Sequence, residues 1–409
     1  MLRYVSVSLL LAAIIVARRP DAVTRPQFWA EDGYVFFYEN LTLGFPRALA
    51  TLYQGFPYLT HRLIAFAGGL VPFAAAPRIY TTSTIALTAL ILASFSLPGF
   101  RHLVHSDGLR VLFGVTAVCL PYDREVLSTP TNLGWFVAIW LSLLSVMRLP
   151  AAPWRIGLLT LAGGVAIFST PLAALNLPLW LLRAWHGRRR RVPAEVVASL
   201  IFVAALAAVV VVTRNLGTAR SLVSIYPGGF LAFVADRLVG FVLSPAALRA
   251  VHDAGTVAVG AVAVIVLAVL FAAVWVGRSR SLTAVLVALY FFLGSMLLLL
   301  LGRPVLLLLA WPSVSYRYTI FPMTMLVLGV VAALDGLPAG MTRRLAGVAL
   351  AGWFVWAWSS RFAVRPFIDQ HWPHHATRLE QKLASGSREP LIIPMNPPWA
   401  PLRFDAPAE

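Results

Sequence analysis

The residues best suited to chemistry are two adjacent carboxylates, Glu31 and Asp32, in the stretch Phe28-Trp29-Ala30-Glu31-Asp32-Gly33. They follow the first apolar segment of a chain with only 16 acidic residues. A carboxylate held beside a reacting hydroxyl can act as a general base. An acidic residue followed by glycine also forms turns and helix caps, and for such a pair taken alone this structural role is the commoner one. The rest of the chain has to decide between the two.

Two further groups of polar residues stand beside apolar runs. The first is Pro121-Tyr122-Asp123-Arg124-Glu125, followed by Asn132-Leu133-Gly134-Trp135, and the second is Tyr316-Arg317-Tyr318 with Pro322. Because a charge is costly at the edge of an apolar segment, Asp123, Glu125 and Arg317 are functional candidates. The alternative for Arg317 is an anchor that reaches from the apolar region to lipid headgroups.

Several histidines are weaker candidates. His61 and Arg62 can face a bound phosphate or only lipid headgroups, and the sequence favours neither role. His371, His374 and His375 have the chemistry of metal ligands, but histidines in a proline-rich tail are more often structural.

The elements that would position these residues are apolar helices. The chain has 409 residues, is 59% hydrophobic and has a mean hydropathy of +0.80. Its long apolar runs alternate with short arginine-rich gaps, which predicts an all-α polytopic membrane protein. About eleven membrane-spanning helices are expected, near residues 1–17, 78–97, 109–121, 132–148, 155–169, 171–186, 194–213, 256–276, 282–301, 316–334 and 343–360.

The same pattern predicts the domain organisation. Residues 1–360 form the transmembrane domain, and its external loop 18–77 carries two interfacial helices, Tyr34–Thr51 and Tyr58–Phe73, rich in aromatic residues. A competing assignment makes His61–Ala76 a true span. A second external loop, 214–255, includes an amphipathic stretch, and residues 361–409 form a short external C-terminal segment, too short for a large domain.

Charge patterning predicts the orientation. The short loops expected on one side all carry arginines, so this side is cytoplasmic and the N-terminus lies there. A cleaved signal peptide is the alternative reading of the first segment, but Ala17-Arg18-Arg19 is a poor cleavage site. Most acidic residues fall on the external side, where polar chemistry is therefore expected. The net charge is +17, and the basic residues that produce it largely flank apolar runs. They therefore indicate contact with membrane lipids, and no nucleic-acid partner is expected.

This layout resembles the GT-C superfamily of integral-membrane glycosyltransferases. The segment from Phe28 to Phe36 is similar to the WAEDG-type segment of bacterial members, and so are Asn132-Leu133-Gly134-Trp135 and Tyr316-Arg317-Tyr318 with Pro322. The resemblance covers most of the chain in layout but only these short segments in sequence. It implies a multi-pass enzyme of a bacterial-type plasma membrane with an extracytoplasmic active site. The enzyme would move a sugar from a polyprenyl-phosphate donor to a glycan, lipid or protein acceptor.

The resemblance also implies roles for the candidate residues. Asp32 is expected to be the general base, with Glu31 as the second choice, and Asp123 or Glu125 supplies a further acid. Arg317 and Tyr318, with Tyr316, would hold the lipid phosphate. Asp123-Arg124-Glu125 matches the D-x-D metal motif only loosely, so we expect no obligatory metal, although a divalent ion stays an option. Direct attack by the acceptor hydroxyl would invert the anomeric centre, and one base with one cation suffices for a phosphate leaving group.

Two other classes of protein remain as alternatives. A lipid or oligosaccharide transporter or flippase would show charged groups at mid-membrane and broken helices in matching halves, whereas the expected spans here hold almost no central acids. A non-catalytic envelope scaffold would arise if the carboxylate pair had lost its activity.

Overall fold

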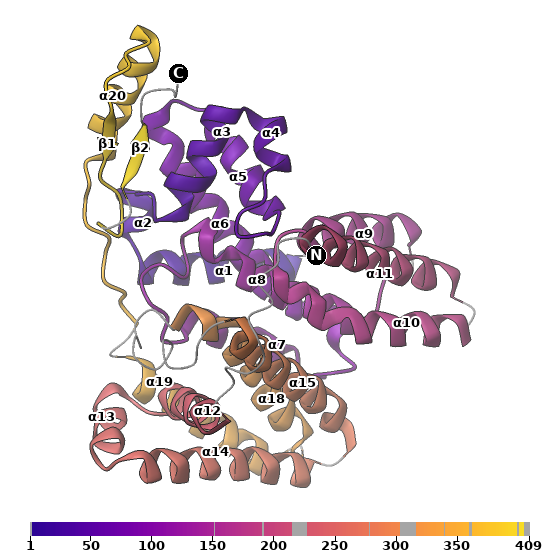
Figure 1. Ribbon diagram of the computed structural model, residues 1–409. Coiled ribbons are helices and arrows are strands. Elements are labelled where there is room, and N and C mark those ends of the chain that lie inside the picture. Colours follow the sequence, from indigo (N-terminus) through magenta and orange to yellow (C-terminus); the bar gives the residue numbers. More distant parts are fainter. Residues whose placement is uncertain are drawn as a thin grey trace.

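The computed structural model describes residues 2–150, 152–189, 192–214, 227–277, 279–302, 316–338, 340–359, 362–398 and 401–404. These residues are mostly helical, which confirms the predicted all-α class, and they include one antiparallel sheet of two strands. Figure 1 shows the helices as a bundle with the C-terminal segment laid against its N-terminal part.

The first half of the described chain is a run of helices of unequal length. They are α1 (Leu2–Arg18), α2 (Asp21–Thr24), the π-helical turn η1 (Asp32–Phe37), α3 (Tyr38–Leu43), α4 (Phe45–Ala50), α5 (Leu59–Gly69), η2 (Phe73–Ala75), α6 (Ala76–Ala93), η3 (Ser94–Ser96), η4 (Pro98–Phe100), α7 (Asp107–Cys119), α8 (Pro130–Val146), α9 (Pro153–Ile167), η5 (Pro171–Asn176) and α10 (Leu177–Arg189).

The second half adds longer helices and the sheet. They are α11 (Pro193–Arg214), α12 (Pro227–Val242), α13 (Pro245–Asp253), α14 (Thr256–Gly277), α15 (Ser279–Gly302), η7 (Tyr316–Thr319), α18 (Ile320–Gly336), α19 (Met341–Trp358), α20 (Trp372–Ser385), β1 (Leu391–Ile393) and β2 (Leu402–Phe404). Leu391 pairs with Phe404, and Ile393 pairs with Leu402.

Most predicted helices coincide with observed ones, and the differences have local causes. The predicted helix 171–186 is split, because a 3-10 turn that begins at Pro171 gives way to α10 near Pro178. The predicted helix 34–51 is broken at Gly44, whose φ of 73° is accessible mainly to glycine. The amphipathic stretch expected at 230–243 lies in α12, while residues 215–226 of that loop fall outside the described residues.

The length of α5 bears on the interfacial assignment. This helix has 11 residues and ends at Gly69. Its length of about 16 Å is far below the ~30 Å of a bilayer core. Helix α7, predicted as a span, has 13 residues and is also short. The length of α5 favours the interfacial assignment over a span from residue 61 to 76.

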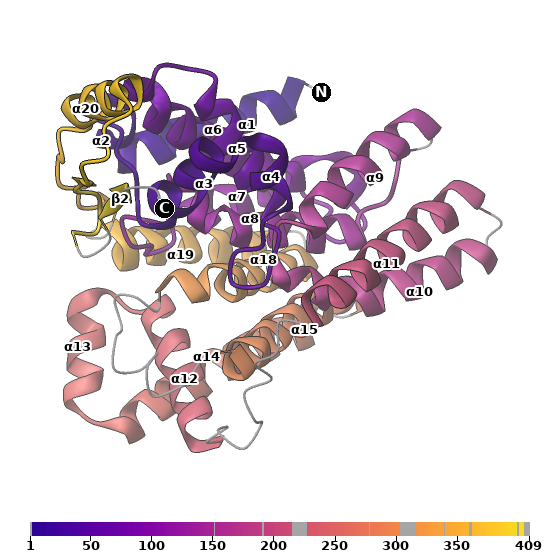
Figure 2. The ribbon, with the colours of Figure 1, turned by 45° about the horizontal axis from the view of Figure 1, so that its top comes forward.

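The core lies where α18 meets its neighbours. Nearly all of α18 is buried, and it packs against α7, α8, α14 and α15. Helices α1 and α8 both pack on α6. In both ribbon views α9, α10 and α11 extend to one side of this centre, while α12, α13 and α14 form a separate group (Figures 1 and 2). Inside the first group, Trp180 stacks on Phe202 at 4.2 Å between ring centres.

Charged residues join several helix ends that the sequence assigns to one side. Asp107 at the start of α7 pairs with Arg3 of α1 and with Arg101, and Asp335 of α18 pairs with Arg343 of α19 at 3.2 Å. The Asp335 carboxylate also accepts a hydrogen bond from the amide of His105 at 2.5 Å. These helix ends therefore lie together in the fold.

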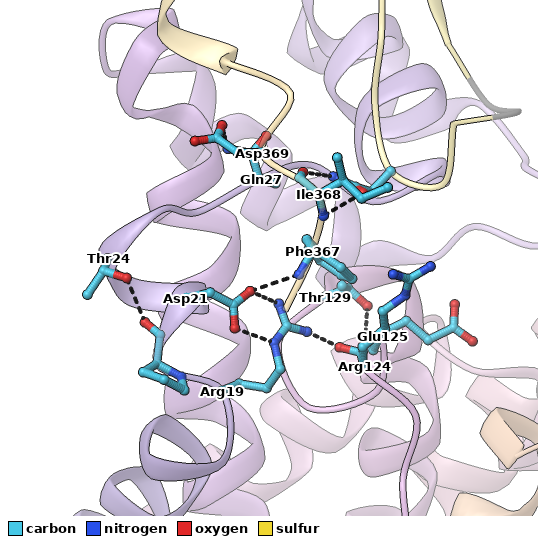
Figure 3. Close-up of polar contacts among 12 residues, drawn as sticks. Arg19, Asp21, Thr24, Gln27, Arg124, Glu125, Thr129, Phe367, Ile368 and Asp369 are labelled. Carbon is cyan, nitrogen blue, oxygen red and sulfur yellow. Dashed lines mark hydrogen bonds and ion pairs between the residues drawn. The ribbon is translucent and has the colours of Figure 1, made fainter. Parts of the chain in front are cut away.

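The C-terminal segment is more ordered than its composition suggests. Its helix α20 and its two strands were not predicted from the sequence. Asp21 forms a buried ion pair with Arg19 (2.8 Å) and accepts a hydrogen bond from the amide of Phe367 (3.1 Å), and Arg19 also donates to the carbonyl of Arg124. Figure 3 shows this junction, in which the tail and α2 meet the loop between α7 and α8 that holds Arg124 and Glu125. The tail is thus fixed to the loop that carries the carboxylate pair.

The outer surface of the described helices is partly apolar. Leu161 on α9, Val264 on α14 and Val348 on α19 are 70%, 65% and 71% exposed. Among the described residues two helical stretches, Phe73–Ser96 and Arg317–Gly336, are long and apolar enough to cross a membrane. Buried core helices pass the same test, so these stretches indicate membrane association only weakly and the eleven-span layout stays a prediction.

Candidate active site

A cavity of about 130 Å³ collects residues from all three stretches that carry the resemblance. Glu31 comes from the residue before the turn η1, Asn132 and Trp135 from the start of α8, and Arg317 and Tyr318 from the turn before α18. The volume is below the ~300–1,000 Å³ that encloses a whole small molecule. It suits the reacting part of a larger ligand.

Glu31 presents a carboxylate at the wall of this cavity. The hydroxyl of Tyr53 donates to its Oε1 at 3.4 Å. Burial, followed by the charge of Glu31, raises the pKa of Tyr53, so this hydroxyl stays protonated and keeps its donor role. The other oxygen, Oε2, is buried and has no hydrogen-bond partner among the described residues. This oxygen therefore has a free hydrogen-bond acceptor site among the described residues.

Asp32 holds the start of α8. Its Oδ1 accepts hydrogen bonds from the amide of Thr131 (2.8 Å) and from the Thr131 hydroxyl (2.6 Å). Thr131 lies in the first turn of α8, where amides have no partner inside the helix, so Asp32 caps this helix from another segment. Asp32 is 2% exposed, and burial raises its pKa to about 8 against the opposing effect of the Thr131 bonds. The cap role that the sequence allowed for this pair falls on Asp32.

Glu125 and Arg317 form an ion pair next to Glu31. The Glu125 Oε2 and the Arg317 Nη1 are 3.4 Å apart, and the guanidinium also lies 5.1 Å from the ring centre of Tyr318. Burial raises the pKa of Glu125 to about 7, while the charge of Arg317 acts in the opposite direction. Tyr318 in turn packs edge-on against Trp135, with ring centres 5.7 Å apart. The structure thus joins the second acidic loop to the candidate phosphate-binding arginine.

Asp123 is not on the cavity wall, and the structure does not describe the side chain of Tyr316. Asp123 bonds to the amide of Arg124 at 2.7 Å and so shapes its own turn. Tyr316 begins the turn η7, but its side chain lies outside the described part of the structure.

His61 and Arg62 lie beneath the site and not on its wall. His61 is fully buried against the rings of Phe36 and Tyr58, and burial lowers its pKa to about 3, so it is neutral. Arg62 pairs with Glu39 and donates to the carbonyl of Thr51 at 3.1 Å. These contacts tie α5 to α3 and α4, and they place neither side chain on the wall of the cavity.

The turn that leads into the two carboxylates has an unusual backbone. Ala30 has a φ of 34°, in the left-handed region that a residue with a Cβ rarely adopts. Before it, Trp29 stacks on Phe367 of the tail with ring centres 4.8 Å apart. After it, Gly33 packs closely on the tail, because an added Cβ would lie 2.2 Å from the sulfur of Met395, near the end of a flexible side chain. A side chain at this position would therefore require Met395 to move.

Sequence reasoning missed Thr131, Tyr53 and the tail. Thr131 follows a proline in a stretch typical of a helix start, but nothing in the sequence names Asp32 as its partner. Tyr53 stands in a turn with no distinctive motif. Among the residues that the structure describes, no three His, Cys, Asp or Glu side chains are grouped as metal ligands, and metal independence stays a prediction.

Comparisons of the chain with models of protein families, with curated proteins and with solved structures find no match.

Proposed function

We propose that the chain is a membrane-embedded inverting glycosyltransferase that moves a sugar from a polyprenyl-phosphate donor to an extracytoplasmic hydroxyl. One observation carries the proposal. A carboxylate, Glu31, and a guanidinium, Arg317, lie on the wall of one cavity together with aromatic rings. These residues come from segments far apart in the chain, and those segments are the ones that resemble the GT-C superfamily.

In the proposed reaction the acceptor oxygen attacks the anomeric carbon. A new carbon–oxygen bond forms as the bond between that carbon and the phosphate oxygen breaks, and the acceptor proton passes to Glu31. The leaving group is the polyprenyl phosphate, whose growing negative charge Arg317 stabilises. Since the two bonds lie on opposite faces of the sugar, the configuration inverts.

The proposal reverses the order in which the resemblance ranks the two carboxylates as the base. Asp32 was the first choice for the base, but it is buried against Thr131, whereas Glu31 lies on the cavity wall. We therefore assign the base to Glu31 and give Asp32 the role of holding α8, which carries Asn132 and Trp135, in place.

The proposed membrane location draws on the apolar outer surface. Exposed leucine, valine and isoleucine side chains on α9, α11, α14, α15 and α19 would contact lipid, since apolar surface of this extent is costly in water. The basic loop ends around Asp107 and Asp335 would then face the cytoplasm, and the cavity the outside.

The test is sugar transfer by the purified protein from a panel of polyprenyl-phosphate sugars, with and without a chelator. Arg317→Ala should lose transfer through weaker donor binding, while Arg344→Ala, an exposed arginine of α19, should not. If wild type transfers sugar and Arg317→Ala retains this activity, Arg317 does not hold the donor phosphate. Absence of transfer together with counterion-coupled uptake into vesicles would favour the transporter, and loss on chelation would overturn the metal-free prediction.

A further inference from the structure

We propose that the C-terminal segment completes the active site, with Asn396 as a positioning residue that acts on Glu31 through the turn at Ala30. The inference rests on the proposed function for the identity of the base. The contacts that carry it belong to the tail, which sequence reasoning treated as a short external appendage.

The main chain of Asn396 holds the turn directly. The amide of Ala30 donates to the carbonyl of Asn396 at 2.5 Å, and Trp29 and Asn396 form a parallel β-bridge. Ala30 stands immediately before Glu31 in the chain. The direction of the Glu31 side chain therefore depends on the backbone that this hydrogen bond fixes.

The backbone held in this way would not be adopted unaided. A left-handed conformation is unfavourable for alanine and persists where surrounding contacts determine it. The conformation of Ala30 sets the direction in which the following residues leave the turn, with Glu31 on the cavity wall and Asp32 bonded to Thr131. Relaxation of Ala30 would turn Glu31 away from the position that we assign to the base.

The side chain of Asn396 fixes the carbonyl that performs this task. It is fully buried, donates to the carbonyl of Ile368 at 2.8 Å and accepts from the amide of Ile368 at 3.2 Å. On either side of this clamp, Met395 fills the space at Gly33 and Phe367 stacks on Trp29. Two tail segments, one around Phe367 and one around Asn396, thus pack against the turn that carries Glu31.

The experiment compares Asn396→Ala with Ile392→Ala, a control on the same hairpin whose side chain is 57% exposed. Hydrogen exchange of the segment 28–33 reports the turn, and turnover and KM for the donor report the chemistry. Asn396→Ala should speed exchange in this segment and lower turnover about 10- to 100-fold with the donor KM unchanged. Asn396→Asp, which keeps the acceptor but loses the donor, should fall between.

A combination with Glu31→Gln separates positioning from general damage. If Asn396 acts through Glu31, Asn396→Ala has no further effect on the residual activity of Glu31→Gln. The proposal is overturned if the losses of the two single variants multiply in the double variant. It is also overturned if Asn396→Ala leaves either hydrogen exchange in the segment 28–33 or turnover unchanged. If wild type transfers no sugar, the proposed function fails by itself, and the exchange result alone decides whether Asn396 holds the turn.

Discussion

At the scale of single residues, the two adjacent carboxylates lie in different surroundings, and burial of Asp32 predicts a pH dependence of stability. Burial raises the pKa of Asp32 to about 8 in the folded protein, against an ordinary value of about 3.9. The folded state then keeps a proton that the unfolded chain releases, so this group's contribution to stability falls as pH rises from about 4 to 8.

Asp32→Asn should remove this fall, because asparagine resembles the protonated carboxyl and still offers an oxygen to Thr131. Thermal unfolding in detergent at several pH values measures it. The unfolding temperature of the variant should rise relative to that of wild type as the pH increases. Parallel curves for the two proteins would contradict the burial argument.

Glu125 and Arg317 give a second pH dependence, in donor binding. Burial raises the pKa of Glu125 to about 7. Below this pH Glu125 is protonated and leaves Arg317 free for the donor phosphate, whereas above it the carboxylate competes for the guanidinium. Donor affinity, measured without acceptor, should therefore weaken as pH rises through about 7 in wild type and stay constant in Glu125→Gln. An equal pH dependence in both proteins would show that Glu125 does not control Arg317.

At the scale of elements, the tail depends on a buried ion pair. Asp21 and Arg19 are 8% and 1% exposed, and Asp21 also binds the amide of Phe367. Asp21→Ala leaves the Arg19 charge buried, which costs about 3–5 kcal/mol in comparable pairs. It should lower the unfolding temperature and open the tail to proteases, and Asp253→Ala, at an exposed acid, should do neither. Resistance of the Asp21→Ala tail equal to wild type would refute this anchoring.

Helix positions were predictable from the sequence because apolar runs and their ends are local signals. Helices α6, α8, α14, α15 and α18 lie within a few residues of their predicted ranges. The site was predictable only in part. Glu31, Arg317 and Tyr318 were named, but the choice between Glu31 and Asp32 depends on contacts with distant segments, of Asp32 with Thr131 and of Glu31 with the cavity. Such long-range contacts leave no periodic pattern in the sequence.

At the scale of the whole molecule, the account predicts two chemically different ends. After replacement of the native Cys119, single cysteines at the exposed residues Gln54 and Arg148 test it. Gln54 lies at the cavity and Arg148 in a predicted cytoplasmic loop. An impermeant thiol reagent should label Gln54→Cys in intact cells, but Arg148→Cys only after permeabilisation. The reverse pattern would invert the topology and place the cavity inside the cell.

The central claim is that the Glu31 cavity is where the sugar is transferred. It is tested most directly by the turnover of wild type, Glu31→Gln and Asp32→Asn with one donor and one acceptor. The account predicts a loss of about 10²- to 10⁴-fold in Glu31→Gln, with most activity kept in Asp32→Asn. Full activity in Glu31→Gln would contradict it, and loss confined to Asp32→Asn would make Asp32 the base.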